Sequence, residues 1–103
     1  QAVAPANLPP IKNTWKVQAG AGTLTFIYRE TESAKGKILV NIKDNILIIQ
    51  NLLDRRIDFM GYELFDGERG NHEAYYLDAK DDFRWDFNQY GRGKVEMWFE
   101  VSR

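Results

Sequence analysis

Few side chains in this 103-residue sequence could act as a nucleophile, a general base or a soft metal ligand. There is one histidine, His72, there are two serines, Ser33 and Ser102, and there is no cysteine. A Ser-His-Asp triad would have to take its serine from the charged segment around Ser33 or from the penultimate position. Neither place resembles the sharply turned nucleophile site of a hydrolase. The absence of cysteine also excludes a thiol nucleophile and a disulfide scaffold. We therefore expect a protein that is not an enzyme.

Carboxylates are more plentiful, and they cluster in two short segments. Residues 78–82 read Asp-Ala-Lys-Asp-Asp, and residues 66–71 read Asp-Gly-Glu-Arg-Gly-Asn. Neither matches a calcium-binding loop, which needs oxygen ligands at alternate positions, a central glycine and a closing glutamate. A zinc site on His72 would lack the further histidine or cysteine that such sites usually use. We expect no metal ion and no cofactor, and we interpret both segments as hairpin loops.

The charge of the chain argues against nucleic acid as a partner. Fourteen basic and fifteen acidic residues give a net charge of −1, which offers no electrostatic footprint for a polyanion. The charge is uneven, because residues 1–52 carry six basic and three acidic side chains, whereas residues 53–103 carry eight and twelve. The acidic half predicts either solvated loops and strand rims or a face that steers a basic partner. The longest apolar run, residues 46–49, is too short to span a membrane.

All three prolines, Pro5, Pro9 and Pro10, lie in the first ten residues. Proline fixes φ and lacks an amide donor, so residues 1–10 are predicted to form an extended arm before a single β-barrel domain, residues 11–103. The uncharged start is typical of a mature N-terminus left after signal removal, and it is equally compatible with a chain shortened at that end. We expect a secreted or periplasmic protein, with a lipid anchor at a processed N-terminus as one form of export.

From Thr14 onward the hydrophobic pattern has mostly a period of two, which is typical of half-buried antiparallel strands. Clusters of glycine, asparagine and aspartate separate the alternating segments and indicate turns. The fold class that follows is all-β, a small antiparallel barrel of seven or eight meandering strands with an extended N-terminal arm. The clearest alternating segments are residues 15–19, 24–28, 38–42, 83–87 and 95–101.

Residues 44–60 are compatible with two structures. Apolar residues spaced by three and four behind Asp44 as an N-cap would give a helix, and with it an α+β fold. Four isoleucines disfavour a helix, and Asp44 and Asn45 tolerate the positive φ of a two-residue hairpin turn. We favour the hairpin, which predicts two cross-strand pairs, Ile42 with Leu47 and Val40 with Ile49.

Aromatic residues make up 14% of the chain and concentrate in its last third. Alternation with charged residues assigns four of them to the interior: Phe83, Trp85, Phe87 and Phe99. Tyr90, in a turn, and Trp98, on the opposite face of its strand, are the surface candidates for stacking on a partner or a sugar. The hairpin register also places an apolar patch on the surface, formed by Leu39, Ile46 and Ile48.

Residues 13–21, Asn-Thr-Trp-Lys-Val-Gln-Ala-Gly-Ala, resemble the opening of small calycin-like barrels, in which a tryptophan of the first strand plugs one end. The matching tryptophan is Trp15, and Asn13 stands where those barrels usually have glycine. In plan the chain is similar to the serralysin-type metalloprotease inhibitors, which carry a flexible N-terminal arm before this strand, although their disulfide has no counterpart here. The resemblance implies that the first residues of the arm lie in a protease cleft: Gln1, Ala2, Val3, Ala4 and Pro5.

The leading functional prediction is a non-enzymatic exported protein that binds another protein, most specifically a peptidase inhibitor. A barrel closed by so short a chain is only just wide enough for its own aromatic side chains, which argues against a roomy ligand cavity. Two alternatives stay open, a small calycin-like binder of an apolar ligand and a carbohydrate-binding module with an aromatic face. The residues predicted to bind the partner are Gln1, Ala2, Val3, Ala4, Pro5, Tyr90 and Trp98.

Overall fold

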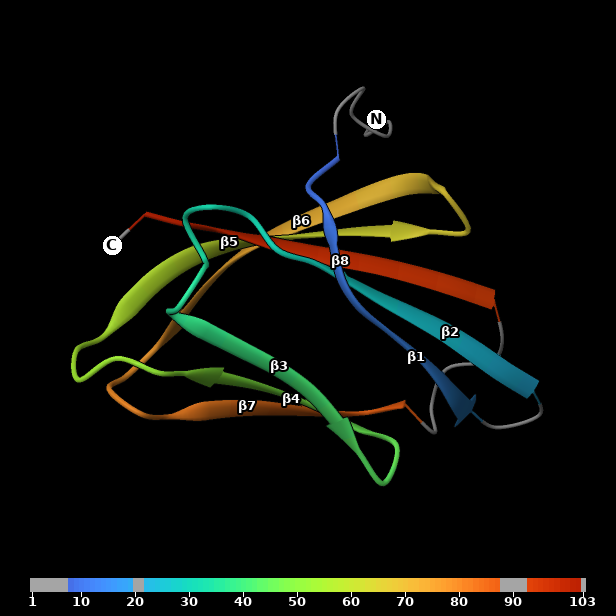
Figure 1. Cartoon of the computed structure of the whole chain (residues 1–103), viewed down its shortest axis with the longest axis horizontal. Helices are drawn as coiled ribbons and strands as arrows, with labels where there is room; N and C mark the ends of the chain where they lie inside the picture. Colours follow the sequence, from blue (N-terminus) through green and yellow to red (C-terminus); the bar gives the residue numbers. More distant parts are fainter. Residues whose placement is uncertain (1–7, 20–21, 88–92, 103) are drawn as a thin grey trace.

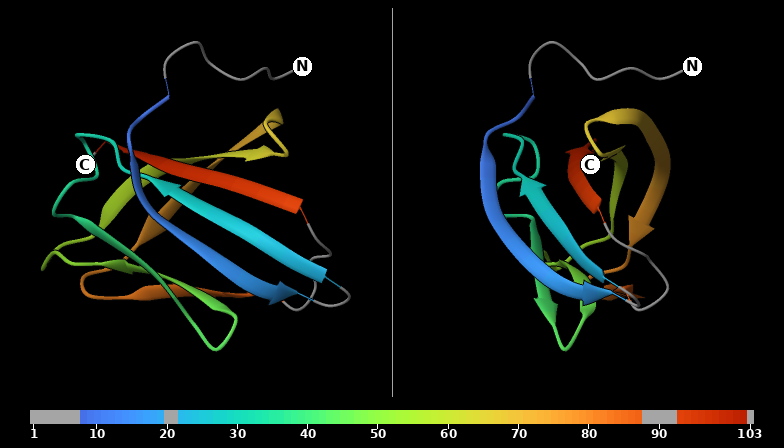
Figure 2. Two further views of the ribbon diagram at one scale, coloured as in Figure 1. Left: turned by 45° about the vertical axis from the view of Figure 1, so that its right-hand side comes forward. Right: turned by 90° about the vertical axis from the view of Figure 1, so that its right-hand side faces the viewer.

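The computed structural model describes residues 8–19, 22–87 and 93–102, which form eight β-strands in two sheets (Figure 1). The strands are β1 (Ile11–Ala19), β2 (Gly22–Arg29), β3 (Ile38–Lys43), β4 (Ile46–Asn51), β5 (Ile57–Phe65), β6 (Glu68–Leu77), β7 (Asp82–Asp86) and β8 (Gly93–Val101). The first sheet has the order β1-β2-β8-β5-β6 and the second the order β3-β4-β7. In both views of Figure 2 the second sheet lies beneath the first. Within the described ranges there is no helix that could cross a membrane.

The all-β prediction is confirmed, but the antiparallel barrel of consecutive meandering strands is wrong. The described strands form two separate sheets, and β2 pairs with β8 in parallel. The chain passes from one sheet to the other after β2, β4, β6 and β7, so β8 returns to lie between β2 and β5. Turn chemistry specifies which consecutive strands form hairpins, but it carries no information about such a long-range pairing.

The hairpin between β3 and β4 is confirmed, and the helix over residues 44–60 is wrong. Asp44 and Asn45 have φ angles of 54° and 63°, the left-handed pair of a two-residue turn whose twist matches the flanking strands. Strand β4, the connection after it and the start of β5 occupy the segment that the helix would have used. The register contains both predicted pairs, Ile42 with Leu47 and Val40 with Ile49.

A second two-residue turn, Asp66-Gly67, joins β5 to β6. Its φ angles are 54° and 78°, and it pairs Phe65 with Glu68. The expectation that residues 66–71 form a loop is therefore wrong from Glu68 onward, where β6 begins. The Asp66 backbone N–H donates to the Lys94 carbonyl at 2.7 Å, and the Lys94 N–H donates to the Asp66 carboxylate at 2.9 Å. These bonds hold the turn against the start of β8.

The core fills the space between the two inner faces. Phe26 and Phe87, whose ring centroids are 5.3 Å apart, connect the first sheet to the segment after β7. The interior positions predicted for Phe87 and Phe99 are confirmed, because both side chains are buried. Phe83 is 42% exposed, so its assignment to the filled interior is wrong, whereas Trp85 is half-buried and packs against the core. Both lie on β7, an edge strand, where the two sheets do not fully cover each other.

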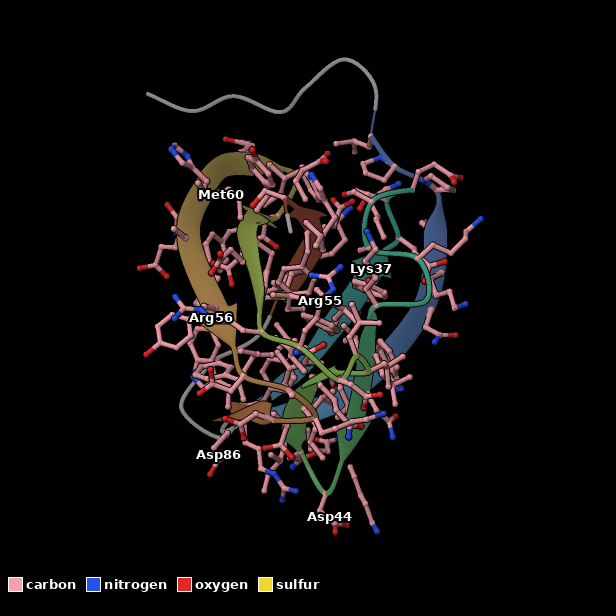
Figure 3. The ribbon with its side chains drawn as sticks, turned by 90° about the vertical axis from the view of Figure 1, so that its left-hand side faces the viewer. Lys37, Asp44, Arg55, Arg56, Met60 and Asp86 are labelled. Carbon is pink, nitrogen blue, oxygen red and sulfur yellow. The ribbon has the colours of Figure 1, made fainter. Side chains whose placement is uncertain are left out.

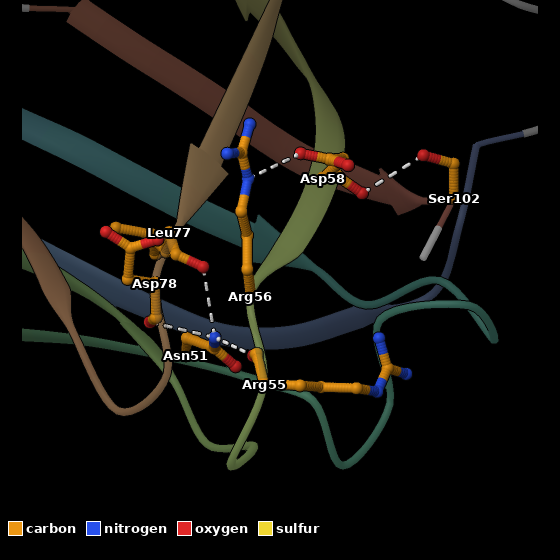
Figure 4. Close-up of polar contacts among 7 residues, drawn as sticks. All are labelled: Asn51, Arg55, Arg56, Asp58, Leu77, Asp78 and Ser102. Carbon is orange, nitrogen blue, oxygen red and sulfur yellow. Dashed lines mark hydrogen bonds and ion pairs between the residues drawn. The ribbon is translucent and has the colours of Figure 1, made fainter.

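One buried amide, that of Asn51, ties together the connections that follow β4 and β6 (Figure 4). Its Nδ2 lies 2.8 Å from the Arg55 carbonyl, 3.2 Å from that of Leu77 and 3.0 Å from that of Asp78. Its Oδ1 accepts the N–H of Leu53 at 2.9 Å. The side chain is 0% exposed, so these carbonyls find in it the donor that water would otherwise supply. The contacts hold the end of β6 beside the end of β4.

Candidate functional site

A narrow cleft opens on the side of the sandwich where β6, an edge of the first sheet, lies beside β7, an edge of the second. Both strands lie at the left of the view in Figure 3, where Asp86 marks the end of β7. The volume open to the centre of a water molecule is ≈ 60 Å³. Six of the lining residues determine its chemistry: Glu63, Asn71, Glu73, Tyr75, Phe83 and Trp85.

The first wall of the cleft comes from β5 and β6, which place polar residues on the inward face. Gly61 pairs with Glu73, and Glu63 pairs with Asn71, so all four positions belong to the face that carries Phe59 and Tyr75. The Asn71 side chain hydrogen-bonds to Glu63. Tyr75 Oη donates to Glu73 Oε1 at 2.8 Å. Two carboxylates therefore lie on this wall, and one of them, Glu73, is bound to the hydroxyl of an aromatic ring.

The second wall comes from β7 and is aromatic. Phe83 pairs with Ile49 and Trp85 with Leu47, both of which are buried, so the two rings face inward from the second sheet. The centroids of Phe83 and Tyr75 are 6.2 Å apart, a ring contact that bridges the sheets at the rim of the cleft. The cleft thus combines apolar walls with anionic oxygen atoms.

The carboxyl group of Glu63 stands in an unfavourable place for a negative charge. Burial, and then the negative charge of Glu73, raise the pKa of Glu63, whereas the hydrogen bond from Asn71 lowers it by less. A carboxylate in such surroundings gains from a cation beside it, because the cation replaces the lost hydration.

A second region of interest is the entry of the N-terminal segment into the domain. Arg29 Nη1 donates to the Pro9 carbonyl at 2.8 Å, and the Glu30 N–H donates to the Pro10 carbonyl at 3.0 Å. The Arg29 guanidinium is held in turn by Glu96, with its Nη2 and Nε 2.8 and 2.9 Å from Glu96 Oε1. Glu96 is buried, so this ion pair is well shielded from solvent. Residues 9 and 10 are thereby fixed to the end of β2.

Of the residues that the sequence predicted to bind a partner, only Trp98 can be placed. Gln1, Ala2, Val3, Ala4, Pro5 and Tyr90 lie outside the described residues. The surface position expected for Trp98 is wrong, because its side chain is 5% exposed and stacks on Tyr62 with centroids 5.7 Å apart. Trp98 lies on the central strand of the first sheet, where neighbouring side chains cover even the outward face.

The prediction of an apolar patch and the prediction for Trp15 fare differently in the structure. Leu39 is exposed and Ile46 and Ile48 are half-buried, all on the outward side of the β3–β4 hairpin, as its register predicts. Trp15 is half-buried on the inward face of the edge strand β1, with its ring 5.8 Å from that of Phe26. Without a closed barrel, this tryptophan has no barrel end to plug.

The few residues with catalytic potential lie apart from one another. The His72 ring lies beside Tyr62, at 6.1 Å, whereas Ser102 Oγ donates to the carbonyl of Asp58, which precedes Tyr62 by four residues on β5. That separation along the strand is about 13 Å. Ser33 Oγ accepts the Val101 N–H at 2.9 Å. Across the described part of the chain, no three histidine or carboxylate side chains form a metal-binding group.

Comparison with known proteins gives no relative. No family model, no curated protein and no solved structure matches this chain. The function has to be argued from the geometry of the cleft and of the N-terminal entry point.

Proposed function

We propose that this chain is an exported, non-enzymatic protein that acts by binding another protein, and that the specific form of this binding is peptidase inhibition. The observation that carries the first part is the size of the cleft. Pockets for small molecules usually measure about 300–1,000 Å³, whereas the enclosed part of this cleft has ≈ 60 Å³. It reaches ≈ 640 Å³ only at its more open end, beside Glu63, Asn71, Glu73 and Trp85. Such a space suits one side chain that reaches in from a partner better than a whole free ligand.

The two alternative functions have less support. An apolar ligand of the kind held in calycin-like barrels would find too little room between the sheets. A carbohydrate-binding face needs exposed rings in a row, and the exposed rings Tyr76 and Phe83 point to opposite faces of different sheets. Of the two rings that the sequence proposed for such a face, Trp98 is buried and Tyr90 lies outside the described residues.

The proposal of peptidase inhibition concerns the residues before the anchored Pro9 and Pro10. A segment rich in proline and small side chains loses little conformational entropy on docking, and a peptidase cleft accepts extended chain by strand-like pairing. The bonds from Arg29 and Glu30 give this segment a fixed starting point on the domain. Gln1, Ala2, Val3, Ala4 and Pro5 are the residues proposed to enter the cleft of the peptidase.

The test compares the full chain with a variant that lacks residues 1–7, against a panel of metallo-, serine and cysteine peptidases that includes a serralysin-type enzyme. We expect the full chain to inhibit at least one peptidase and the truncated chain to inhibit none, with nearly equal melting temperatures. A chain in which glycine and serine replace residues 1–7 separates length from sequence. Inhibition by the truncated chain at equal strength would refute the role of the arm. A full chain that inhibits no peptidase and captures no protein from its native extract would refute the proposal altogether.

A further inference from the structure

We infer that the cleft between β6 and β7 receives a lysine side chain of the partner protein, with its ammonium group at Glu63 and Glu73 and its stem between Tyr75 and Trp85. The inference depends on the proposed function in one respect, namely that the lysine belongs to a protein. Size, charge and wall chemistry support it separately.

The size of the cleft matches a slender chain. A water-sized particle needs at least about 10–15 Å³ of such space, so ≈ 60 Å³ holds at most a handful of non-hydrogen atoms. The lysine side chain is a flexible four-carbon stem that ends in a compact ammonium group. The cleft widens to ≈ 640 Å³ at its open end beside Glu63, Asn71, Glu73 and Trp85, so its narrow part limits the stem of the guest and not the charged tip.

The charge of the cleft selects a cation. Glu63 and Glu73 are the charged groups among its described lining residues, and none of these residues is lysine or arginine. Among the described residues, those that line the cleft around Glu63 are Asn71 and Glu73 from β6, Met97 from β8 and Trp85 from β7. None of them neutralises the carboxylate. A cation from outside the chain would supply the missing charge.

One arginine of the chain, Arg56, stacks on a ring of β6. Arg56 lies over the Tyr76 ring, 4.0 Å from its centroid, and its Nε donates to Asp58 Oδ1 at 3.3 Å (Figure 4). Tyr76 belongs to the outward face of β6, whereas Tyr75 belongs to the inward face. The ring on the outward face therefore already has a cation of the chain itself.

The walls suit the rest of a lysine side chain. Its methylene groups pack well on the faces of Tyr75, Phe83 and Trp85, and an ammonium near a tryptophan or tyrosine face is attracted by the ring quadrupole. A half-buried glutamate with a second carboxylate nearby is a poor choice for the stability of the fold. Such locally unfavourable residues are expected where a protein binds something.

The experiment titrates three small probes into the ¹⁵N-labelled full chain at pH 7.5: n-butylammonium, n-butylguanidinium and 1-butanol. We expect millimolar binding of n-butylammonium, at least tenfold tighter than that of 1-butanol, with shifts at the Gly61 and Glu73 amides and the Trp85 indole. Glu63→Gln should weaken n-butylammonium at least tenfold. Glu68→Gln removes the same charge from an exposed position on β6 that does not line the cleft, so it should leave the affinity within twofold.

Each remaining outcome overturns a stated part of the inference. Equal affinity for 1-butanol and n-butylammonium would show an apolar site without charge selection, and no shift at 100 mM probe would show no site at all. Tighter binding of n-butylguanidinium would indicate that the side chain supplied by the partner is an arginine and not a lysine. A partner captured equally well by the full chain and by Glu63→Gln would refute the cleft as its contact and leave the proposed function standing. Probe binding without capture of any protein would refute the proposed function alone.

Discussion

The ring of Tyr75 lies across Gly61, so close that a Cβ atom on Gly61 would stand 2.8 Å from Tyr75 Cε2. The same Cβ would be 3.3 Å from Phe99 Cε1. The Tyr75 ring also stacks on Phe59, with centroids 5.6 Å apart, and its hydroxyl reaches Glu73. A glycine in the middle of a strand usually marks a close approach of another group. Here it lets an aromatic side chain of the neighbouring strand form the wall of the cleft.

Gly61→Ala should therefore destabilise the protein by about 1–3 kcal/mol, the usual range for overpacking a filled site. The measurement is the free energy of unfolding from urea titration. The matched test repeats the substitution in a Tyr75→Leu background, where the ring is gone and the added methyl group has more room. If Gly61→Ala costs the same in both backgrounds, the contact with Tyr75 is not the cause of the loss.

Glu63→Gln should raise the melting temperature at neutral pH. Burial and Glu73 raise the pKa of Glu63 in the folded state, so the folded protein disfavours the carboxylate more than the unfolded chain does. The resulting loss of stability is absent below pH 4.5, the ordinary pKa of the group in the unfolded chain. It grows as the pH rises toward the pKa of Glu63 in the folded state and is complete above that pKa.

Melting temperatures of the parent chain and of Glu63→Gln, measured from pH 3.5 to 8, check this prediction. The gain should be largest at pH 7–8 and should vanish toward pH 4. Glu68→Gln, at an exposed position of the neighbouring strand, serves as the control and should change the melting temperature little. A lower melting temperature for Glu63→Gln at pH 7 would mean that a favourable partner of the chain itself already holds the carboxylate.

The sequence allowed the β3–β4 hairpin to be predicted in full, because Asp44-Asn45 and the strict alternation on both sides point to the same register. For the hairpin that carries the cleft, the sequence predicted a turn within residues 66–71 but not the strands on its two sides. The inward positions of this hairpin include Gly61 and Glu63 on β5 and Asn71 and Glu73 on β6, which break the apolar alternation expected of a buried face. The residues that interrupt the alternating pattern of these strands are the same residues that give the cleft its chemistry.

The central strand shows a second limit of such patterns. Alternation along β8 correctly places Val95, Met97 and Phe99 inward, but residues 95–99 are all buried. The parity of a strand position tells which face a side chain takes, not what covers that face. Glu96 and Trp98 are buried because β8 has strands on both sides, a consequence of the parallel pairing with β2. No local signal in the sequence specifies that pairing.

Asn51→Ala should lower the free energy of unfolding by more than about 2 kcal/mol, because each buried polar group left without a partner costs about 1–3 kcal/mol. The amide serves the carbonyls of Arg55, Leu77 and Asp78 and the N–H of Leu53, and it has no exposure to solvent. Urea denaturation measures the loss. Asn41→Ala removes an exposed amide from the same sheet, where it accepts only the N–H of Ile42 among the bonds described, and should cost well under half as much.

The same variant also tests whether Asn51 affects the geometry of the cleft. Because the amide positions the β6–β7 connection, Asn51→Ala should also broaden or shift the Trp85 indole signal in the ¹⁵N spectrum under conditions where the protein remains folded. An unchanged Trp85 signal, with the expected loss of stability, would show that Asn51 stabilises the fold without setting the geometry of the cleft.

Tyr28→Phe should leave the stability unchanged or raise it by up to about 2 kcal/mol, because a buried hydroxyl without a partner carries a desolvation cost that phenylalanine avoids. The Tyr28 side chain is 2% exposed, and within the described part of the protein its hydroxyl has no hydrogen-bond partner. Burial, and then the charge of Glu30, raise the pKa of Tyr28, so this hydroxyl stays protonated over the whole working range. Tyr75→Phe is the matched control, since that hydroxyl donates to Glu73 and its removal should cost about 0.5–1.5 kcal/mol. A loss of more than about 1 kcal/mol in Tyr28→Phe would contradict the prediction and would indicate that an internal water satisfies the hydroxyl in solution.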